Sequence, residues 1–327
     1  MLRDGVGNMT VLVTGGTGFL GSYVLGHIAD VAPEETVVAF DRYPNPEHCE
    51  GSGARLIAGD ILEIQELVST VNQYRVDTII HLAYLPGGIP NKERLVPYLR
   101  VQCMGTANVL EAARICGIQR VVNASSSAVY GRRTAGPFTE DDPVDPDEIY
   151  GACKVWGEQV SQLYMDQHGI DVFNLRLGGS VGYGRLDRAS LQAGLHSDRG
   201  TWMAAPEIAA RTGQFPAPQD SVLFDFIHAA DTAAAFWAAA TVPHATNRVF
   251  NVCGPRHAAG EMTALLQELL PGVKVDYAAE YKHVPLLDNA RLIAELGFAP
   301  KYDLRAGVTE YVRTVQQKVD TSEELPK

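Results

Sequence analysis

Two residues four positions apart, Tyr150 and Lys154 in the segment YGACK, have side chains suited to acid–base chemistry. On a helix, a spacing of four places both side chains on one face, so they reach the same space. A tyrosine titrates at about 10, but a neighbouring ammonium stabilises the phenolate and lowers that pKa. The pair is therefore predicted to exchange a proton with a substrate hydroxyl or carbonyl.

A glycine-rich turn supplies a second chemical signal. The segment TGGTGFLG (14–21) follows an apolar run and opens a helical stretch. Gly15 allows a tight turn, Gly18 lets the backbone approach a pyrophosphate, and Gly21 allows the helix to pack closely on the sheet. The start of this helix offers free N–H groups and the positive end of its dipole. The turn thus predicts dinucleotide binding.

Acidic residues after the next two strands refine the cofactor prediction. Asp41 ends the second predicted strand, 20 residues after Gly21, where a carboxylate binds the adenosine ribose hydroxyls and rejects a 2′-phosphate. This favours NAD, although Arg42 beside it could accept the phosphate of NADP. Asp60 is assigned to the adenine edge, to the N-cap of a helix beginning at Ile61, or to both.

Two further strand ends complete the expected site. HLAY (81–84) ends the fourth strand and places the small Ala83 beside the expected cofactor path, while His81 is interpreted as a packed strand residue. ASSSAVYG (124–131) leaves the fifth strand and presents hydroxyl groups that could hold a substrate oxygen.

The elements that must position these residues alternate along the chain. Strands separated by helices require right-handed crossovers, and near-continuous apolar strands are typical of parallel sheets covered on both faces. The predicted fold is a Rossmann-type doubly wound α/β sheet. Its strands are expected at 9–14, 36–40, 54–58, 77–83, 120–124 and 171–177, and its helices at 18–31, 61–74, 94–117 and 148–168.

The alternation stops after residue 178. We expect an NAD-binding domain at 1–178, with segments near 223–252 returning to it, and a mainly substrate-binding lobe at 179–327. The later elements are expected as helices near 229–240, 259–270, 288–296 and 304–318 and a strand at 248–252.

Composition limits the partners. A net charge of −12 and a pI near 5.2 argue against nucleic acid and anionic membranes, and no apolar run approaches the roughly 20 residues of a membrane span. The five cysteines are scattered without a CxxC pair. They indicate reduced thiols in a cytoplasmic protein and no metal site.

Together, TGGTGFLG, GDI, HLA, SSSAVYG, YGACK and DFIHAAD (225–231) resemble the extended short-chain dehydrogenase/reductase family, also called the NAD-dependent epimerase/dehydratases. The resemblance implies that Tyr150 is the acid–base and that Lys154 binds the nicotinamide ribose. It also implies that Ser126 bridges to the substrate oxygen, with Ser125 beside the cofactor and Ser127 near the substrate. A homodimer through a four-helix bundle, made from the helices near 94–117 and 148–168, is a further implication.

With this resemblance the predicted cofactor contacts form one set. They are Gly15, Thr17, Gly18, Phe19, Leu20, Gly21, Asp41, Arg42, Asp60, Ile61, Leu82, Ala83, Tyr84, Ser125, Tyr150 and Lys154.

Departures from the family pattern narrow the substrate. Dehydratases carry an Asp-Glu pair where this chain has Ser127 and Ala128, so dehydration is disfavoured. Enzymes that grip a nucleotide diphosphate usually have an Asn and two Arg where this chain has Gly179, Phe224 and Pro285. Other cations could replace those contacts from new positions: Arg185, Arg188 and Arg211. The predicted substrate contacts are Ser127, Gly179 and Arg185.

The sequence thus predicts an oxidoreductase that transfers a hydride at a secondary alcohol or carbonyl of a sugar-like or polyol-like small molecule. A nucleotide-sugar epimerase with tightly bound NAD is the alternative. A non-catalytic NAD(P)-sensing protein is a third hypothesis, which the retained Tyr150 and Lys154 disfavour.

Overall fold

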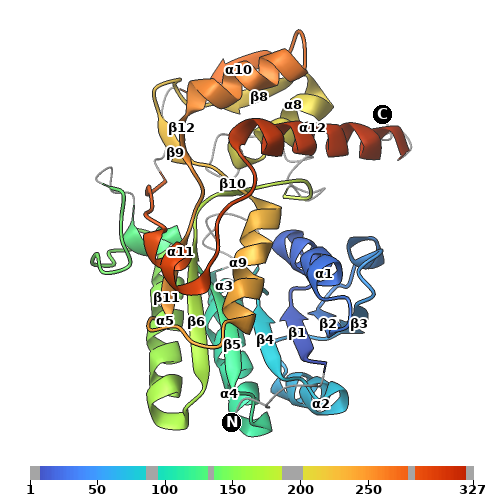
Figure 1. Ribbon diagram of the computed structural model, residues 1–327, viewed down its shortest axis with the longest axis vertical. Coiled ribbons are helices and arrows are strands. Elements are labelled where there is room, and N and C mark those ends of the chain that lie inside the picture. Colours follow the sequence, from blue (N-terminus) through green and yellow to red (C-terminus); the bar gives the residue numbers. More distant parts are fainter. Residues whose placement is uncertain (1–7, 86–94, 132–135, 186–201, 279–283, 322–327) are drawn as a thin grey trace.

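The computed structural model describes residues 8–85, 95–131, 136–185, 202–278 and 284–321. Its central sheet consists of seven parallel strands. Their order is β11-β6-β5-β4-β1-β2-β3 (Figure 1). The bounds are β1 Thr10–Thr14, β2 Thr36–Asp41, β3 Arg55–Ala58, β4 Thr78–His81, β5 Arg120–Ser126, β6 Asp171–Leu177 and β11 Val249–Val252. The predicted doubly wound sheet is confirmed, and the chain changes direction across it between β1 and β4.

The apolar character of the strands follows from the layers on both faces. Val11 and Val13 of β1 point into a core with α1 and α9, whereas Leu12 between them points into a core with α2 and α4. Successive strand residues face opposite sides, so burial on both faces favours apolar residues at successive positions. The covering helices are α1 Phe19–Val31, α2 Ile64–Tyr74, α4 Thr106–Cys116, α5 Ile149–His168, α9 Ala229–Thr241 and α11 Ala290–Leu296.

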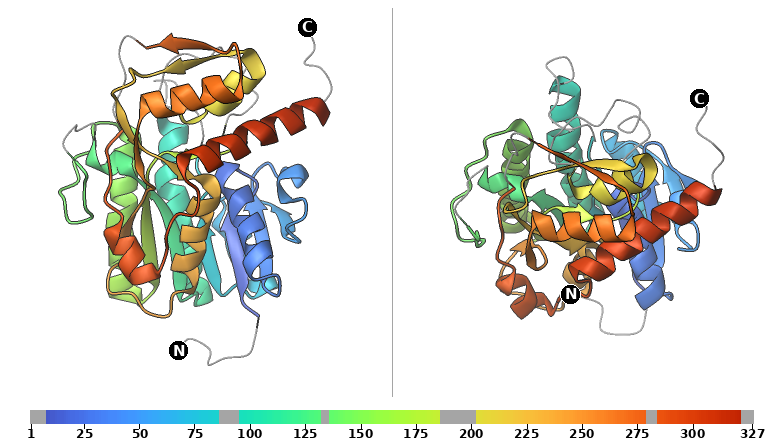
Figure 2. Two further views of the ribbon diagram at one scale, coloured as in Figure 1. Left: turned by 45° about the horizontal axis from the view of Figure 1, so that its top comes forward. Right: turned by 90° about the horizontal axis from the view of Figure 1, so that it is seen from above.

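A second lobe lies beyond the carboxyl ends of the sheet strands (Figures 1 and 2). It has its own apolar core, which includes the buried Trp202 and Phe224. Three two-stranded sheets pair β7 with β10, β8 with β13, and β9 with β12. The elements are β7 Ser180–Val181, α8 Ala205–Thr212, β8 Gln214–Ala217, β9 Leu223–Asp225, β10 Ile227–His228, β12 Arg256–Ala258, α10 Ala259–Leu269, β13 Lys274–Tyr277 and α12 Leu304–Thr321.

Two predicted helices differ from the structure. The helix expected to begin at Ile61 begins at Ile64 with Glu63 as its N-cap, so the N-cap role proposed for Asp60 is wrong. Asp60 instead accepts a hydrogen bond from the Leu62 backbone N–H (2.9 Å), which forms a turn before the helix. The single helix expected at 94–117 is divided into α3 Leu95–Leu99, a π-helical segment η2 at Arg100–Gly105, and α4.

Short connecting elements complete the fold. The 3₁₀ turns η1 Pro46–Cys49 and η3 Ser127–Tyr130 follow β2 and β5. Among the helices described, none is long and apolar enough to cross a membrane.

Candidate active site

The glycine turn joins β1 to α1 and packs against the end of β4. Gly15 has a φ of +68°, and a Cβ there would lie 2.8 Å from the Ala83 Cα, so only glycine fits against the backbone of the β4 end. A Cβ on Gly21 would lie 2.1 Å from the Gly15 carbonyl oxygen. Gly21 therefore allows α1 to pack directly against the backbone of the glycine turn. The sequence instead predicts that this glycine brings the helix close to the sheet.

The start of α1 is suited to an anion. Gly18 is the N-cap, no side chain caps the helix, and its first turn contains no acidic residue. Gly18 is exposed, whereas Thr17 before it is buried. The unpaired N–H groups and the helix dipole favour a phosphate here, and the close backbone contacts at Gly15 and Gly21 leave no room for side chains. The turn therefore fits a dinucleotide pyrophosphate.

Asp41 is held at the end of β2 by hydrogen bonds from two directions. Its Oδ2 accepts from the Thr17 hydroxyl (2.8 Å) and backbone N–H (3.2 Å), and its Oδ1 accepts from the Tyr43 N–H (3.3 Å). The carboxylate is half-buried. It is thus oriented beside the glycine turn, where a ribose diol would find an acceptor.

The other predicted cofactor residues divide between surface and core. Tyr84 is exposed and Arg42 pairs with Asp60, while Leu82 is buried. Ile61 is buried, and its Cδ1 would lie 2.3 Å from a Cβ built on Gly105. Phe19 and Leu20, in the first turn of α1, are half-buried.

His81 has a structural role beneath the site, at the end of β4. Its Nδ1 lies 2.7 Å from the Thr14 hydroxyl, and its Nε2 lies 3.2 Å from the Thr106 hydroxyl, which itself donates to the Gln102 carbonyl. Burial, with Lys154 as a smaller cause, lowers the pKa of His81 to about 3. The imidazole is therefore neutral and hydrogen-bonded, as the interpretation of a packed strand residue requires.

The structure brings Ser126, Tyr150 and Lys154 together. The Ser126 hydroxyl hydrogen-bonds to the phenol of Tyr150, and the Lys154 Nζ lies 5.5 Å from the centre of the Tyr150 ring. Lys154 also donates to the Ala124 carbonyl (2.8 Å), which ties α5 to the end of β5. A hydroxyl donor, a phenol and an ammonium therefore converge where β5 ends.

Burial dominates the pKa values of this trio. It raises the pKa of Tyr150 to about 12, while the Ser126 hydrogen bond and the Arg185 charge lower it. It also lowers the pKa of Lys154 to about 8, while the nearby Cys153 and Cys103 side chains and the Glu158 carboxylate act in the opposite direction. The predicted depression of the Tyr150 pKa by Lys154 is not found, because burial raises the pKa of the phenol and lowers that of the ammonium.

Ser125 points into a buried ionic network that the sequence did not reveal. Its hydroxyl donates to Glu158 (2.5 Å), and Arg176 holds the same carboxylate through Nε (2.9 Å) and Nη2 (2.7 Å). Arg176 also donates to the Tyr130 hydroxyl (2.7 Å). Any cofactor contact of Ser125 therefore involves its backbone or a rearranged hydroxyl.

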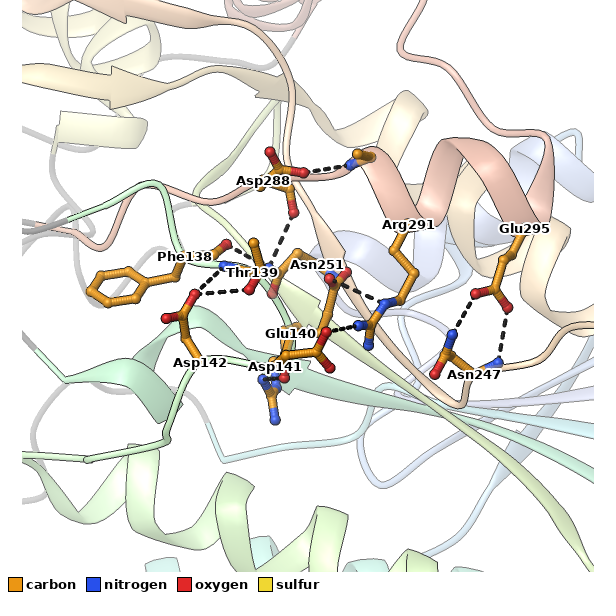
Figure 3. Close-up of polar contacts among 12 residues, drawn as sticks. Phe138, Thr139, Glu140, Asp141, Asp142, Asn247, Asn251, Asp288, Arg291 and Glu295 are labelled. Atoms are coloured by element: carbon orange, nitrogen blue, oxygen red, sulfur yellow. Dashed lines mark hydrogen bonds and ion pairs between the residues drawn. The ribbon is translucent and has the colours of Figure 1, made fainter.

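Tyr130 extends this network to Asn251, whose own polar contacts are drawn in Figure 3. Its hydroxyl donates to Asn251 Oδ1 (2.9 Å), and the Asn251 amide donates to the carbonyls of Phe138 (2.9 Å) and Asp288 (3.1 Å). Glu140 accepts from the Asn251 backbone N–H (2.7 Å). Polar contacts thus connect β11 to the segment after η3 and to the segment before α11.

Apolar side chains fill the places of the missing diphosphate contacts. A Cβ on Gly179 would lie 2.6 Å from the buried Met203 Cε. Phe224 is buried edge-on against Trp202, with ring centres 5.7 Å apart. Pro285 is buried as well.

Cations near these places have separate roles. Arg185 donates to the Ser180 carbonyl (2.6 Å) and lies 5.6 Å from the centre of the Phe19 ring, at the start of α1. Arg211 forms an ion pair with the buried Glu207 (3.0 Å), which lies on the same helix of the second lobe. Ser127 is buried in η3, and Arg188 lies outside the described residues.

Comparison with known proteins identifies the family. The sequence profile of the NAD dependent epimerase/dehydratase family matches residues 11–253. The chain belongs to this family. Its fold and its dependence on NAD match the extended short-chain dehydrogenase/reductase enzymes.

The relatives of this chain include UDP-glucose 4-epimerases. The chain is 28% identical to UDP-glucose 4-epimerase of Azospirillum brasilense, over 95% of this chain and 93% of that protein. It is 33% identical to an uncharacterized protein of Methanocaldococcus jannaschii, over 55% of this chain and 59% of that protein. The structure of MoeE5 in complex with UDP-glucose and NAD superposes with a TM-score of 0.78 and 27% identity, covering 96% of this chain and 100% of that one.

Proposed function

We propose that this member of the family is an NAD-dependent dehydrogenase or reductase acting at a secondary alcohol or carbonyl of a sugar-like or polyol-like molecule without a nucleotide. The observation that carries the substrate class is the packing around Gly179 and Phe224. Met203 occupies the space beside Gly179, and Phe224 is buried against Trp202. Neither position can present the amide or guanidinium that would bind a diphosphate.

The residues at the end of β5 support the reaction. In the oxidation direction the Tyr150 phenolate oxygen accepts the substrate hydroxyl proton, and in the reduction direction the phenol returns it to the carbonyl oxygen. The Ser126 hydroxyl holds that same oxygen. Lys154 stabilises the phenolate and binds the nicotinamide ribose.

The glycine turn, Asp41 and Lys154 are the residues proposed to hold NAD. When bound, NAD supplies the acceptor or donor of the hydride at the substrate carbon. The remaining work of the chain is to orient the substrate oxygen and to move its proton.

A UDP-hexose epimerase is the second candidate, and the comparisons favour it. The Azospirillum brasilense relative is a UDP-glucose 4-epimerase that aligns along nearly the whole chain, and MoeE5 was crystallised with UDP-glucose and NAD. Arg185 is the described cation that could replace a lost diphosphate contact, because it lies at the start of α1 near Tyr150.

Ligand-dependent unfolding distinguishes the two candidates. We expect UDP-glucose and UDP-glucuronic acid to leave the unfolding temperature of the NAD-loaded protein unchanged. A ligand present at a hundredfold excess over its Kd would raise the free energy of unfolding by about 2.7 kcal/mol. Stabilisation of that size by either nucleotide sugar would favour the epimerase.

We also propose that the protein is a cytoplasmic homodimer assembled through α4 and α5. All five cysteines are free thiols, in keeping with a reducing compartment. Apolar side chains on the outer faces of the two helices, among them Leu163 and Ile115, are exposed.

A further inference from the structure

A cleft of about 410 Å³ lies beside the ends of β2 and β3 and contains charges of both signs. Its lining includes two cations, Arg42 and Arg100, and two carboxylates, Asp60 and Glu63. Arg42 directly follows Asp41, so its side chain begins next to the proposed ribose site. Any group attached to the adenosine 2′-oxygen would meet this cleft.

Within the cleft, Arg42 is paired with Asp60. Its Nε lies 3.3 Å from the Asp60 Oδ2, and its guanidinium lies 5.2 Å from the centre of the Tyr43 ring. Asp60 is fixed from its other side, since its Oδ1 accepts from the Leu62 N–H (2.9 Å) and its own N–H donates to Glu66 (2.8 Å). The carboxylate is therefore the stationary partner, and the half-exposed arginine is drawn toward it.

This pair bears on which dinucleotide the site accepts. NADP differs from NAD by a 2′-phosphate, and a free guanidinium beside it would form strong charge-assisted hydrogen bonds. A guanidinium already paired with Asp60 must leave that partner first, and the remaining carboxylate then repels the phosphate. The ion pair penalises NADP and leaves NAD unaffected.

We propose that Asp60 is a specificity-determining residue that selects NAD over NADP by holding Arg42 in this ion pair. The proposal rests on the adenosine ribose lying at Asp41. It adds a second determinant to Asp41, whose carboxylate oxygens accept from Thr17 and Tyr43 and have no hydrogen bond or ion pair with Arg42 among the described contacts.

A double-mutant cycle on cofactor binding tests the proposal. The purified full chain is prepared as wild type, Asp60→Asn, Arg42→Met and the double variant, and the Kd values of NAD and NADP are measured by calorimetry at low ionic strength. The amide oxygen introduced by Asp60→Asn can still accept from the Leu62 N–H, so the turn is preserved. The ratio of the two Kd values cancels any adenine contact of Asp60, because both dinucleotides contain adenine.

We expect Asp60→Asn to shift the Kd ratio toward NADP by about three- to fivefold, the size of an exposed ion-pair contribution. In the Arg42→Met background the same substitution should shift the ratio clearly less, because it then relieves only the direct repulsion between the Asp60 carboxylate and the phosphate. Glu63→Gln is the matched control, because it removes a carboxylate of the same cleft that has no described bond to Arg42.

Three results would overturn the proposal. They are an unchanged ratio in Asp60→Asn, an equal shift with and without Arg42, and an equal shift in Glu63→Gln. The last two would mean that the overall charge of the cleft, and not the ion pair, acts on the phosphate. Since no substrate turnover is measured, these outcomes are independent of the proposed reaction.

Discussion

Burial raises the pKa of the Tyr150 phenol to about 12, so the phenol favours its protonated form at neutral pH. The YGACK spacing predicts a tyrosine whose pKa an adjacent ammonium lowers. The structure places the ammonium correctly, but burial moves the pKa of Lys154 down to about 8 at the same time. The positive charge of an oxidised nicotinamide, if bound beside Tyr150, would favour the phenolate and lower this pKa.

Replacing Tyr150 by Phe should abolish most catalysis and spare the cofactor site. Only the phenolic oxygen is lost, and a positioned acid–base typically contributes ~10²–10⁴-fold, so turnover should fall at least about a hundredfold. NAD affinity, measured by calorimetry, should change little. Tyr277→Phe, which removes a hydroxyl bonded to Asp220 in the second lobe, is the control and should keep full activity. A Tyr150→Phe enzyme with more than about a tenth of wild-type turnover would contradict the assignment.

Lys154 should make NAD binding depend on pH. Its ammonium is present below a pKa of about 8 and is lost above it, so a contact with the nicotinamide ribose weakens as the pH rises through that value. The Kd of NAD, measured between about pH 6.5 and 9.5, should therefore increase above about 8 in the wild type. Lys154→Met should bind more weakly and show no such dependence. A persisting rise in the Lys154→Met variant would assign the ionisation elsewhere.

At the residue scale, the sequence predicts best where the partners are close along the chain. Tyr150 and Lys154 share a helix, and the glycine turn is a single segment, so spacing suffices. The partner of Ser125 is Glu158, whose own partner Arg176 lies on another strand. Nothing local indicates that contact, just as nothing near Gly179 indicates that Met203 will pack on it.

Among the elements, α5 and β6 are joined by the buried pair of Glu158 and Arg176. Their side chains are 9% and 7% exposed. Removal of one partner leaves an uncompensated charge in a site that is largely shielded from water. Arg176→Met should therefore lower the free energy of unfolding by about 3–5 kcal/mol, as measured by urea denaturation.

Two companion variants separate the charge effect from packing. Adding Glu158→Leu to Arg176→Met removes the stranded carboxylate and should recover part of the lost stability. The exposed pair of Arg305 and Glu268 on the second lobe is the control, since Arg305→Met should cost less than about 1 kcal/mol. A loss below that value for Arg176→Met would show that the buried pair contributes little.

The outer faces of α4 and α5 should form a dimer interface. Ile115 on α4, Leu163 on α5 and Met104 in η2 just before α4 are 51%, 53% and 52% exposed, and a second copy would cover these apolar side chains. Leu163→Asp should therefore convert a dimer to a monomer in sedimentation equilibrium. Val31→Asp places the same charge at an equally exposed position (51%) on α1 and should leave the dimer intact. A wild-type monomer at micromolar concentration would refute the interface.

The helices and strands are predicted correctly where the pattern of buried residues has a clear period along the sequence. The sequence predicts the strands from β1 to β6 because each is bounded by turns and all but the edge strand β3 are largely buried on both faces. The π-helical segment η2 and the delayed start of α2 were missed, since the hydrophobic pattern continues through both. The strands of the second lobe, such as β7 and β10, are as short as two residues and are fixed by distant pairing.

At the scale of the whole molecule, the fold alone does not identify the substrate. L-threonine dehydrogenase of Phytophthora infestans and UDP-glucose 4-epimerase of Thermotoga maritima both superpose with a TM-score of 0.81 and 20% identity. The named substrates of those two proteins are chemically unlike. The chemistry of this chain must be inferred from Ser126, Tyr150 and Lys154 and from the apolar packing around Phe224.

The most direct test follows NADH formation by its absorbance while purified protein, NAD and single substrates are mixed. The substrates are sugars, polyols and hydroxy acids without a nucleotide in one series, and UDP-glucose and UDP-glucuronic acid in the other. We predict many turnovers of NADH with at least one nucleotide-free alcohol, loss of that activity in Tyr150→Phe, and no reaction with the UDP-sugars. Conversion of a UDP-sugar to its epimer without net NADH would contradict the proposed dehydrogenase.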